Sequence, residues 1–392
     1  MKKVTMKKLD TTTNKKIIVF TSSGGGGHTS ATSALENYLH EQYEIKAVHI
    51  FKLLQHLDPI RVITGNKYSC EELFNEFLPK KYIRLLTWIS RLGIEYIHRR
   101  RKRIYRELRA YIMEEQPVLI ISVIPVMNYI ILDVAQELNI PFLLIPTDLD
   151  ITLYIQRIYN PTYKQFYIGL SFNDKDILKL IKKNHIASEH IVVLSAPLKI
   201  DFFEHQNKNI LKQQYNIPPD KPVIMLLMGS RGSYETEKYT RQLLNLPFPA
   251  HLLICIGKNI KSKIAISHFK VPSHITLSII EFTEHIADYM AMSDLLISKS
   301  GTQSVCEALY KNIPLFLDAT SRVLPWEKFN LNFIKKHHFG EGIKRYNQIV
   351  PLITSVIQNT HMLMLYKHHI KQLDKKNFSK ELLILVKKIV PC

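Results

Sequence analysis

Short apolar runs rich in β-branched residues alternate with longer amphipathic stretches along this sequence, and the alternation occurs in two successive series. Continuous apolar runs of this length are typical of parallel strands that are buried on both faces. Strands that alternate with helices indicate right-handed βαβ units, which build doubly wound sheets. We therefore predict an α/β fold with two parallel sheets. The predicted strands are Ile17–Thr21, Tyr43–Ile50, Leu119–Val123, Phe142–Pro146, Gln165–Leu170 and Ile191–Leu194, then Val223–Met228, His251–Ile256, Ile275–Ile279, Leu295–Ser298 and Pro314–Leu317.

The two series are separated by a stretch from Pro197 to Pro222 that contains charged residues and the pair Pro218-Pro219. A chain of 392 residues has about the length of two or three domains, and each half is long enough to bury a core. We place the domain boundary near residue 200. The expected units are a disordered leader at 1–15, an N-terminal domain at 16–200, a C-terminal domain at 201–350 and helices at 351–392 that pack back on the N-terminal domain.

The charge balance indicates an anionic partner. Lys and Arg number 53 against 34 Asp and Glu, a formal net charge of +19. Nucleic acid, an acidic membrane surface and a phosphorylated substrate all fit such a charge, and so does generic lysine usage. The four cysteines form no C-x-x-C pair, which is typical of reduced thiols in a cytosolic protein. No apolar run reaches the ~18 residues of a transmembrane helix, so any membrane contact is expected to be peripheral.

A glycine-rich loop from Thr21 to His28 directly follows the first predicted strand and directly precedes a helix. It lacks the Gly-Lys-Ser/Thr of a P-loop and the third glycine of a dinucleotide fingerprint. What remains is a tight turn that delivers His28 to the carboxyl end of a strand, with Gly25, Gly26 and Gly27 free to approach an acceptor or a phosphate. A helix N-terminus beside His28 should lower the pKa of the imidazole, which favours the neutral base. An ordinary turn with an incidental histidine is the alternative.

Three loops of the second series also end strands, namely Met228–Ser233, Ile256–Asn259 and Ser298–Glu307. Hydroxyl groups and backbone N–H groups at a strand-to-helix turn are suited to a diphosphate. The Glu307 carboxylate can accept two ribose hydroxyls. Glu327 and Asn330 are three residues apart on one helix face, where they can bind sugar hydroxyls. Taken singly, each of these features is also compatible with an ordinary turn or a solvated helix surface.

Together, Gly24–His28, Thr147-Asp148, Gly257–Asn259, Lys299–Glu307 and Glu327–Asn330 resemble the motifs of one enzyme family in order and spacing. The family is that of the monogalactosyldiacylglycerol synthases and processive diacylglycerol glucosyltransferases. It is related to the lipid-linked N-acetylglucosaminyltransferase of peptidoglycan synthesis. The resemblance covers most of the chain, roughly residues 16–340.

This resemblance implies a GT-B fold, in which two Rossmann-like domains face each other across a cleft. It implies an inverting transfer of a hexose from a UDP-sugar to a lipid acceptor, diacylglycerol, without a metal or other cofactor. His28 is then the expected base, and Asp148 is a second candidate. The donor side is expected to comprise Gly229, Ser230, Gly257, Asn259, Ser300, Gly301, Thr302, Gln303, Glu307, Glu327 and Asn330.

Several positions depart from the family pattern. Relatives carry further His and Trp residues after the Thr-Asp pair, where this chain reads Leu149 to Tyr154, and this leaves the acceptor open. Ser300, Ser304 and a less glycine-rich Gly229–Gly232 loop leave the donor sugar open. The alternatives are a polyprenyl-linked or other acceptor, or a protein that has lost catalysis and keeps its affinity for UDP-sugar or membrane.

A basic amphipathic stretch from Lys80 to Arg109 has eleven Lys/Arg and two Glu, a net charge of +9. Apolar residues recur in it at helical spacing. A basic helix with an apolar face is suited to an anionic bilayer, with Trp88, Arg99, Arg100 and Arg101 as membrane contacts. We expect peripheral association with the inner face of the membrane and no nucleic-acid partner. A stripe that faces the core, with a solvated basic face, is the alternative.

Overall fold

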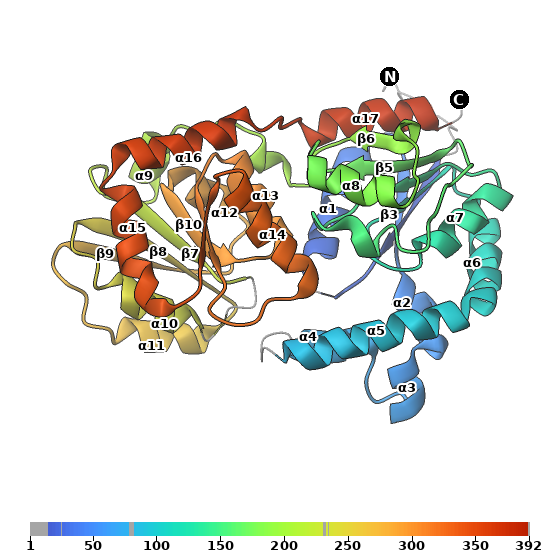
Figure 1. The fold of residues 1–392 in the computed structure, drawn as a ribbon, viewed down its shortest axis with the longest axis horizontal. Coiled ribbons are helices and arrows are strands. Elements are labelled where there is room, and N and C mark those ends of the chain that lie inside the picture. The colour runs from blue at the N-terminus through green and yellow to red at the C-terminus, as the bar shows by residue number, and fades with distance from the viewer. Residues whose placement is uncertain (1–14, 25, 78–81, 230–232, 234, 391–392) are drawn as a thin grey trace, which may run out of the picture.

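The computed structural model describes residues 15–24, 26–77, 82–229, 233 and 235–390. Two lobes lie side by side, and each is built on a six-stranded sheet covered by helices (Figure 1). Every strand pairs with its neighbours in parallel. The predicted α/β class with two doubly wound sheets is therefore confirmed. The expected leader falls almost entirely on residues 1–14, which lie outside the described residues.

The N-terminal sheet has the strand order β2-β1-β3-β4-β5-β6. Its strands are β1 (Lys16–Thr21), β2 (Glu44–His49), β3 (Leu119–Ser122), β4 (Phe142–Leu144), β5 (Phe166–Leu170) and β6 (Ile191–Val193). The helices of this part are α1 (Gly27–Leu39), α2 (Ile50–Leu53), α3 (Pro59–Thr64), α4 (Cys70–Phe77), α5 (Ile83–Arg99), α6 (Arg101–Glu115), α7 (Asn128–Glu137) and α8 (Lys175–Lys183).

Strand β1 shows why the apolar runs form buried strands. Its residues Ile17, Ile18, Val19 and Phe20 are all fully buried. Ile18 and Phe20 belong to the core on one face of the sheet, and Ile17 and Val19 belong to the core on the other face. Successive side chains of a strand point to opposite faces, so a strand with helices on both sides needs an uninterrupted apolar run.

The C-terminal sheet has the order β12-β11-β10-β7-β8-β9. Its strands are β7 (Val223–Leu227), β8 (Ala250–Gly257), β9 (Ile275–Glu281), β10 (Leu295–Lys299), β11 (Leu315–Asp318) and β12 (Gly340–Ile343). The helices are α9 (Lys208–Gln214), α10 (Glu235–Leu243), α11 (Ile260–Ser267), α12 (Ile286–Met292), α13 (Thr302–Tyr310), α14 (Pro325–Lys336), α15 (Ile349–Ile357), α16 (Thr360–Gln372) and α17 (Phe378–Ile389). All eleven predicted strands are present, and β12 is an additional edge strand.

The terminal helices divide between the two lobes. The sequence predicts that residues 351–392 pack on the N-terminal domain, but α15 and α16 lie on the C-terminal domain (Figure 1). They bury an apolar stripe that includes Ile349, Ile353 and Tyr366 against the second sheet. Helix α17 crosses over, and its Phe378 and Leu382 join the N-terminal core. The chain therefore passes between the two domains twice, once near residue 200 and once between α16 and α17.

Helices α4, α5 and α6 form an excursion between β2 and β3. Helix α5 packs mainly against its chain neighbours α4 and α6, and it runs along the lower edge of the N-terminal lobe in the view of Figure 1. Within the described ranges, no single helix combines the length and the apolar character of a membrane span. The helical segment 346–357 and the following helix α16 are long and apolar enough only when they are taken together, and their axes meet at a bend of 88°.

Direct contacts join the domains in the structure. Phe172, which follows β5, stacks on Phe333 of α14 with ring centroids 6.0 Å apart. His337, just after α14, contacts Asp174 at 2.9 Å through Nε2 and Oδ2. Although burial opposes it, hydrogen bonding to His337 and to the first turn of α8 lowers the pKa of Asp174 to about 2. These contacts fix the cleft between the two sheets.

Candidate functional site

A cavity of about 900 Å³ opens where the carboxyl ends of the two sheets face each other. Loops after strands of both domains line it, as expected for open α/β sheets, which bind ligands at this edge. The N-terminal domain contributes loop residues after β1 and after β4, and the C-terminal domain contributes the loops after β7, β8 and β10. Of the expected site residues, the cavity is lined by Gly26, Gly27, His28, Asp148, Gly229, Gly257, Gly301, Thr302, Gln303, Glu307 and Glu327.

His28 is the second residue of α1, and its hydrogen bonds determine its tautomer. Nδ1 lies 2.8 Å from the carbonyl oxygen of Val123 and 3.0 Å from Oγ1 of Thr147. A carbonyl can only accept, so Nδ1 carries the proton and Nε2 keeps its lone pair. Nε2 has no partner in the described part of the chain, and the ring lines the cavity. His28 is therefore set up as an acceptor of a proton.

The pKa of His28 is lowered from its ordinary value of 6.5. Burial is the main cause, while the Asp148 carboxylate and the carbonyl of Val123 oppose it. The sequence predicts the same direction but attributes it to the helix N-terminus. Burial is the largest cause of the lowered pKa, and it favours the neutral imidazole near pH 7.

A chain of hydrogen bonds connects His28 to Asp148. Thr147 Oγ1, which contacts the ring of His28, lies 2.8 Å from the hydroxyl of Tyr154. That hydroxyl donates to Oδ2 of Asp148 at 3.0 Å. The other oxygen, Oδ1, accepts from Oγ1 of Thr302 in the opposite domain at 3.1 Å. Burial raises the pKa of Asp148, and His28 opposes that rise. Each oxygen of Asp148 thus accepts one hydrogen bond, one from each domain.

Asn330, expected on the donor side, lies behind the cavity wall. Its side chain is fully buried and does not line the cavity. Its Nδ2 donates to the carbonyl of Ser300 at 2.7 Å and to Oγ1 of Thr302 at 2.9 Å. Ser300, only 1% exposed, does not line the cavity either. Both residues shape the loop between β10 and α13, so that Gly301 and Thr302 face the cavity.

Asn259, also expected on the donor side, caps a helix and does not line the cavity. Its Oδ1 accepts from the backbone N–H of Ser262 in the first turn of α11. Gly257 and Gly229 do line the cavity, and both adopt the positive φ that favours glycine, 58° and 96°. Two further expected residues, Gly25 and Ser230, lie outside the described residues.

Two carboxyl groups lie on the C-terminal side of the cavity, those of the buried Glu307 and the half-buried Glu327. Burial raises the pKa of Glu307 to about 7, although Gln303 Nε2 donates to its Oε1 at 3.0 Å. Burial, reinforced by the charge of Asp148, also raises the pKa of Glu327 to about 7. Carboxyl groups that are costly to bury persist where a ligand supplies their missing partners, so both are candidates for binding hydroxyl groups.

Sequence analysis misses several residues that the cavity gathers. Lys258 lies over the ring of Phe282 with its Nζ 4.8 Å from the centroid, and the Phe282 side chain is 50% exposed. Lys299, at the end of β10, also lines the cavity. Their positions directly after predicted strands are the signal that points to them. Thr147 also follows a predicted strand directly, but Tyr154 gives no such signal, since its role depends on a fold that brings it beside Thr147 and Asp148.

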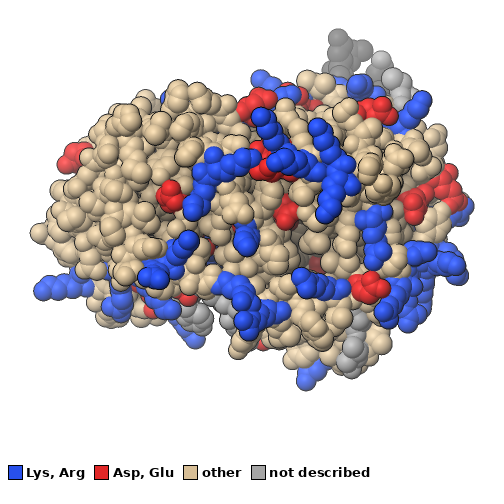
Figure 2. Space-filling view, viewed as in Figure 1, with Lys and Arg blue, Asp and Glu red and all other residues tan. Residues whose placement is uncertain are grey.

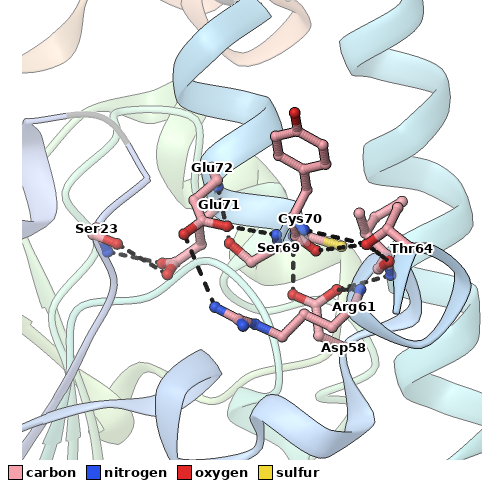
Figure 3. Close-up of polar contacts among 10 residues, drawn as sticks. Ser23, Asp58, Arg61, Thr64, Ser69, Cys70, Glu71 and Glu72 are labelled. Atoms are coloured by element: carbon pink, nitrogen blue, oxygen red, sulfur yellow. Dashed lines mark hydrogen bonds and ion pairs between the residues drawn. The ribbon is translucent and has the colours of Figure 1, made fainter. Parts of the chain in front are cut away.

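Helix α4 holds the glycine-rich loop from outside the sheet (Figure 3). Glu71 accepts from both the backbone N–H and the hydroxyl of Ser23, at 2.8 and 2.9 Å. The start of α4 is defined by a capping box, in which Ser69 and Glu72 bond each other's backbone N–H groups. Asp58 accepts from the backbone N–H of Cys70 and caps α3, which fixes the two helices to each other. Helices α3 and α4 therefore hold the loop that leads to His28 in position.

The expected membrane residues lie at the surface. The Trp88 side chain is 59% exposed on α5, and Arg99, Arg100 and Arg101 are exposed where α5 passes into α6. Basic side chains gather at the α6 end of the molecule, at the right of the view in Figure 2. The described residues contain no group of three or more His, Cys, Asp or Glu that could hold a metal ion.

Known proteins match both the second domain and the whole chain. Residues 223–317 match the glycosyltransferase family 28 C-terminal domain. The processive diacylglycerol beta-glucosyltransferase of Bacillus subtilis (strain 168) is 23% identical over 345 residues, which cover 86% of this chain and 85% of the relative. The chloroplastic monogalactosyldiacylglycerol synthase of Spinacia oleracea is 23% identical over 64% of this chain and 48% of its own length.

Solved structures show the same architecture. MurG of Acinetobacter baumannii superimposes with a TM-score of 0.64 and 13% identity, over 95% of this chain and 99% of that one. A calicheamicin glycosyltransferase, CalG4, gives a TM-score of 0.56 at 11% identity, over 96% of this chain and 100% of that one. These matches confirm the GT-B fold and the resemblance indicated by the sequence motifs. The chain is a glycosyltransferase of the hexosyltransferase class with the GT-B fold, and its second domain is similar to the glycosyltransferase family 28 C-terminal domain.

Proposed function

We propose that this chain transfers a hexose from a UDP-sugar to a lipid acceptor, diacylglycerol, at an anionic membrane surface. The observation that carries the proposal is the shared cavity. It brings the free Nε2 of His28 together with the buried acids and the lysines of the C-terminal domain. A base and an anion site across one cleft are what an acceptor and a nucleotide-sugar require.

The C-terminal side of the cavity has the groups that a UDP-sugar needs. The N-terminus of α13 begins after Gly301 and offers N–H groups to a diphosphate, and Lys299 and Lys258 add positive charge. The exposed ring of Phe282 offers a surface for the base. Glu307 would accept the ribose hydroxyls, and Glu327 those of the hexose. No metal is needed in this proposal, because cations and helix N–H groups stabilise the leaving diphosphate.

The reaction that fits this geometry is a single displacement. Nε2 of His28 takes the proton of the acceptor hydroxyl as its oxygen bonds to the anomeric carbon. The bond from that carbon to the β-phosphate oxygen breaks, and its electron pair leaves with UDP. One in-line attack inverts the anomeric carbon. The Asp148 carboxylate, which already raises the pKa of His28, stabilises the imidazolium that forms.

A lipid acceptor is supported by α5 and by the relatives. The outward face of α5 exposes Leu85, Trp88 and Leu92, with side chains 42%, 59% and 51% exposed. Arginines surround this face, so it suits an anionic bilayer. The named relatives in Bacillus and spinach act on, or make, diacylglycerol lipids. The three cysteines of the described chain are unpaired thiols, which suits the cytoplasmic face of the membrane.

The test is to incubate the protein with diacylglycerol vesicles and UDP-glucose, UDP-galactose or UDP-N-acetylglucosamine, and to analyse the lipids by mass spectrometry. We expect a hexosyl-diacylglycerol with at least one donor. No glycolipid with any of the three donors would contradict the proposal. Transfer to a polyprenyl phosphate but not to diacylglycerol would keep the donor half and replace the acceptor.

A further inference from the structure

The cavity has an apolar arm that none of the donor or base assignments uses. It extends from the glycine-rich loop into the N-terminal domain, between α2–α4 on one side and α5 on the other. Apolar side chains form its walls, and they include Phe51, Leu54, Phe74, Leu86, Ile89 and Ile97. A UDP-sugar has no group that would gain from such walls. The arm is therefore suited to an apolar occupant of its own.

Helix α5 carries two neighbouring apolar stripes, whereas an ordinary surface helix has one apolar stripe that faces the core. Leu86, Ile89, Gly93 and Ile97 recur at helical spacing and line the cavity. Leu85, Trp88 and Leu92 form a second stripe about a third of a turn around the helix and are exposed. Leu86 is only 1% exposed, yet it belongs to none of the large core clusters of the described residues. Ile97, near the end of α5, packs against the N-terminal core, and Leu86 and Ile89 line the cavity ahead of it, so the helix covers the arm.

Gly93 lies at a part of the arm that no protein side chain fills. It lies in the middle of α5, where glycine costs stability relative to alanine. Gly93 lines the cavity, and a Cβ added there would meet no heavy atom within 4 Å. No backbone requirement explains this glycine, because its φ is not in the left-handed region. What it provides is empty volume at the inner face of the helix.

We propose that this arm holds one hydrocarbon chain of the lipid acceptor, and that Gly93 sets how long a chain it accepts. The inference rests on the proposed function, because the chain belongs to the molecule whose hydroxyl faces His28. With its outer face on the bilayer and its inner face on the arm, α5 gives the chain a continuous apolar path from membrane to active site. Burying the chain aligns the acceptor hydroxyl with Nε2 of His28.

Gly93→Leu tests the proposal, because it fills the arm without a clash at Cβ and removes an unfavourable helix glycine. Gly93→Ala, which adds one methyl group, is the matched control. Both variants and the wild type are assayed in mixed micelles that hold dioctanoylglycerol or dioleoylglycerol at equal mole fraction. We expect Gly93→Leu to lose about tenfold in kcat/KM for dioleoylglycerol, the factor for about two methylenes left unburied. Dioctanoylglycerol should be used almost as before.

Binding of a pyrene-labelled diacylglycerol, followed by fluorescence, gives a readout that does not depend on transfer. Weaker binding of the probe by Gly93→Leu than by Gly93→Ala supports the proposal that the arm holds a hydrocarbon chain. If the probe binds in this way but no variant makes a glycolipid, only the proposed function fails. Equal binding of the probe by all three proteins would overturn the arm, and so would an equal loss for both chain lengths. A thermal midpoint for Gly93→Leu at or above that of the wild type shows that the fold is intact.

Discussion

At the scale of single residues, the buried acid Glu307 illustrates how a binding group costs stability. Its carboxyl has an ordinary pKa of 4.5 and a pKa of about 7 in the folded protein. The folded state therefore binds this proton more tightly than the unfolded state. The charged carboxylate begins to destabilise the protein above about pH 4.5, and the cost is complete above about pH 7, where it is of the order of ~3 kcal/mol.

Glu307→Gln should therefore raise the thermal midpoint at pH 8 and leave it nearly unchanged at pH 4, as measured by calorimetry. The same variant should bind UDP about tenfold more weakly, because a charged acceptor for the ribose hydroxyls is lost. Glu189→Gln, at an exposed position, is the control and should change neither quantity. An equal stabilisation at both pH values would show that burial of the charge is not the cause.

Asp148 makes a prediction about pH dependence. A base must be deprotonated to act, so activity is lost as pH falls through the pKa of His28, which is below 6.5. Asp148→Asn removes a charge that raises this pKa, so the acidic limb of kcat/KM should move to lower pH. At pH values above this limb, kcat/KM of Asp148→Asn should be about tenfold or more below that of the wild type, since the imidazolium loses its counter-charge.

The control for Asp148 is Tyr154→Phe, which breaks the hydrogen-bond chain but keeps the carboxylate. Its acidic limb should stay close to that of the wild type. An Asp148→Asn limb that moves to higher pH would contradict the electrostatic role.

Single residues also show what the sequence could predict. Gly301 lies in the loop after β10, and His28 and Glu307 lie in the helices that follow β1 and β10, so their place near the sheet edge can be predicted from the chain order alone. Asn330 has the right chemistry and spacing for a sugar contact, but α14 packs so that its amide bonds the Ser300 carbonyl. Which face of a helix meets the cavity depends on packing against a distant loop, and local spacing carries no information about that.

At the scale of elements, α4 determines the position of the glycine-rich loop. Its Glu71 gives Ser23 two hydrogen bonds through both carboxylate oxygens. Glu71→Ala should release the loop and lower kcat about tenfold, because charge-assisted hydrogen bonds contribute ~1.5–3 kcal/mol. UDP affinity, measured by calorimetry, should not change. Glu114→Ala, at an exposed position on α6, is the matched control. Unchanged turnover in Glu71→Ala would show that Glu71 does not hold the glycine-rich loop in its active position.

Helix α5 should anchor the protein to membranes. Replacing Trp88 and Leu92 together by Ser should weaken binding to anionic vesicles by about tenfold or more, since both side chains lose apolar burial. Cosedimentation with vesicles measures this. The matched control replaces Met364 and Ile384, which are similarly exposed (55% and 65%) on α16 and α17. Equal losses for both pairs would show that α5 is not the membrane contact.

Elements differ in how well the sequence predicts them. The strands of the two sheet centres are continuous apolar runs, and all were predicted within one or two residues. Strand β12 (Gly340–Ile343) was not, because it holds two glycines and a glutamate and owes its strand form to pairing with β11. Its Gly340 is required by that pairing, since a Cβ there would lie 1.7 Å from the carbonyl oxygen of Leu315.

At the scale of the whole molecule, two domains complete one active site. Each sheet follows from local patterns, so the two-domain α/β architecture can be predicted from the sequence. The contacts that bring the domains together cannot, because Thr302 and Asp148 are 154 residues apart and share no periodic pattern. The cleft places His28 on one side and the acids and lysines on the other, so neither domain alone should transfer a sugar.

The most direct test of this account compares UDP binding and glycosyl transfer in His28→Ala. Calorimetry with UDP and mass spectrometry of diacylglycerol vesicles incubated with the UDP-sugar substrate measure the two steps separately. We expect UDP to bind as tightly as to the wild type, because His28 lies in the acceptor domain, and glycolipid formation to fall by about a hundredfold or more. Full transfer by His28→Ala would contradict the assignment of His28 as the base.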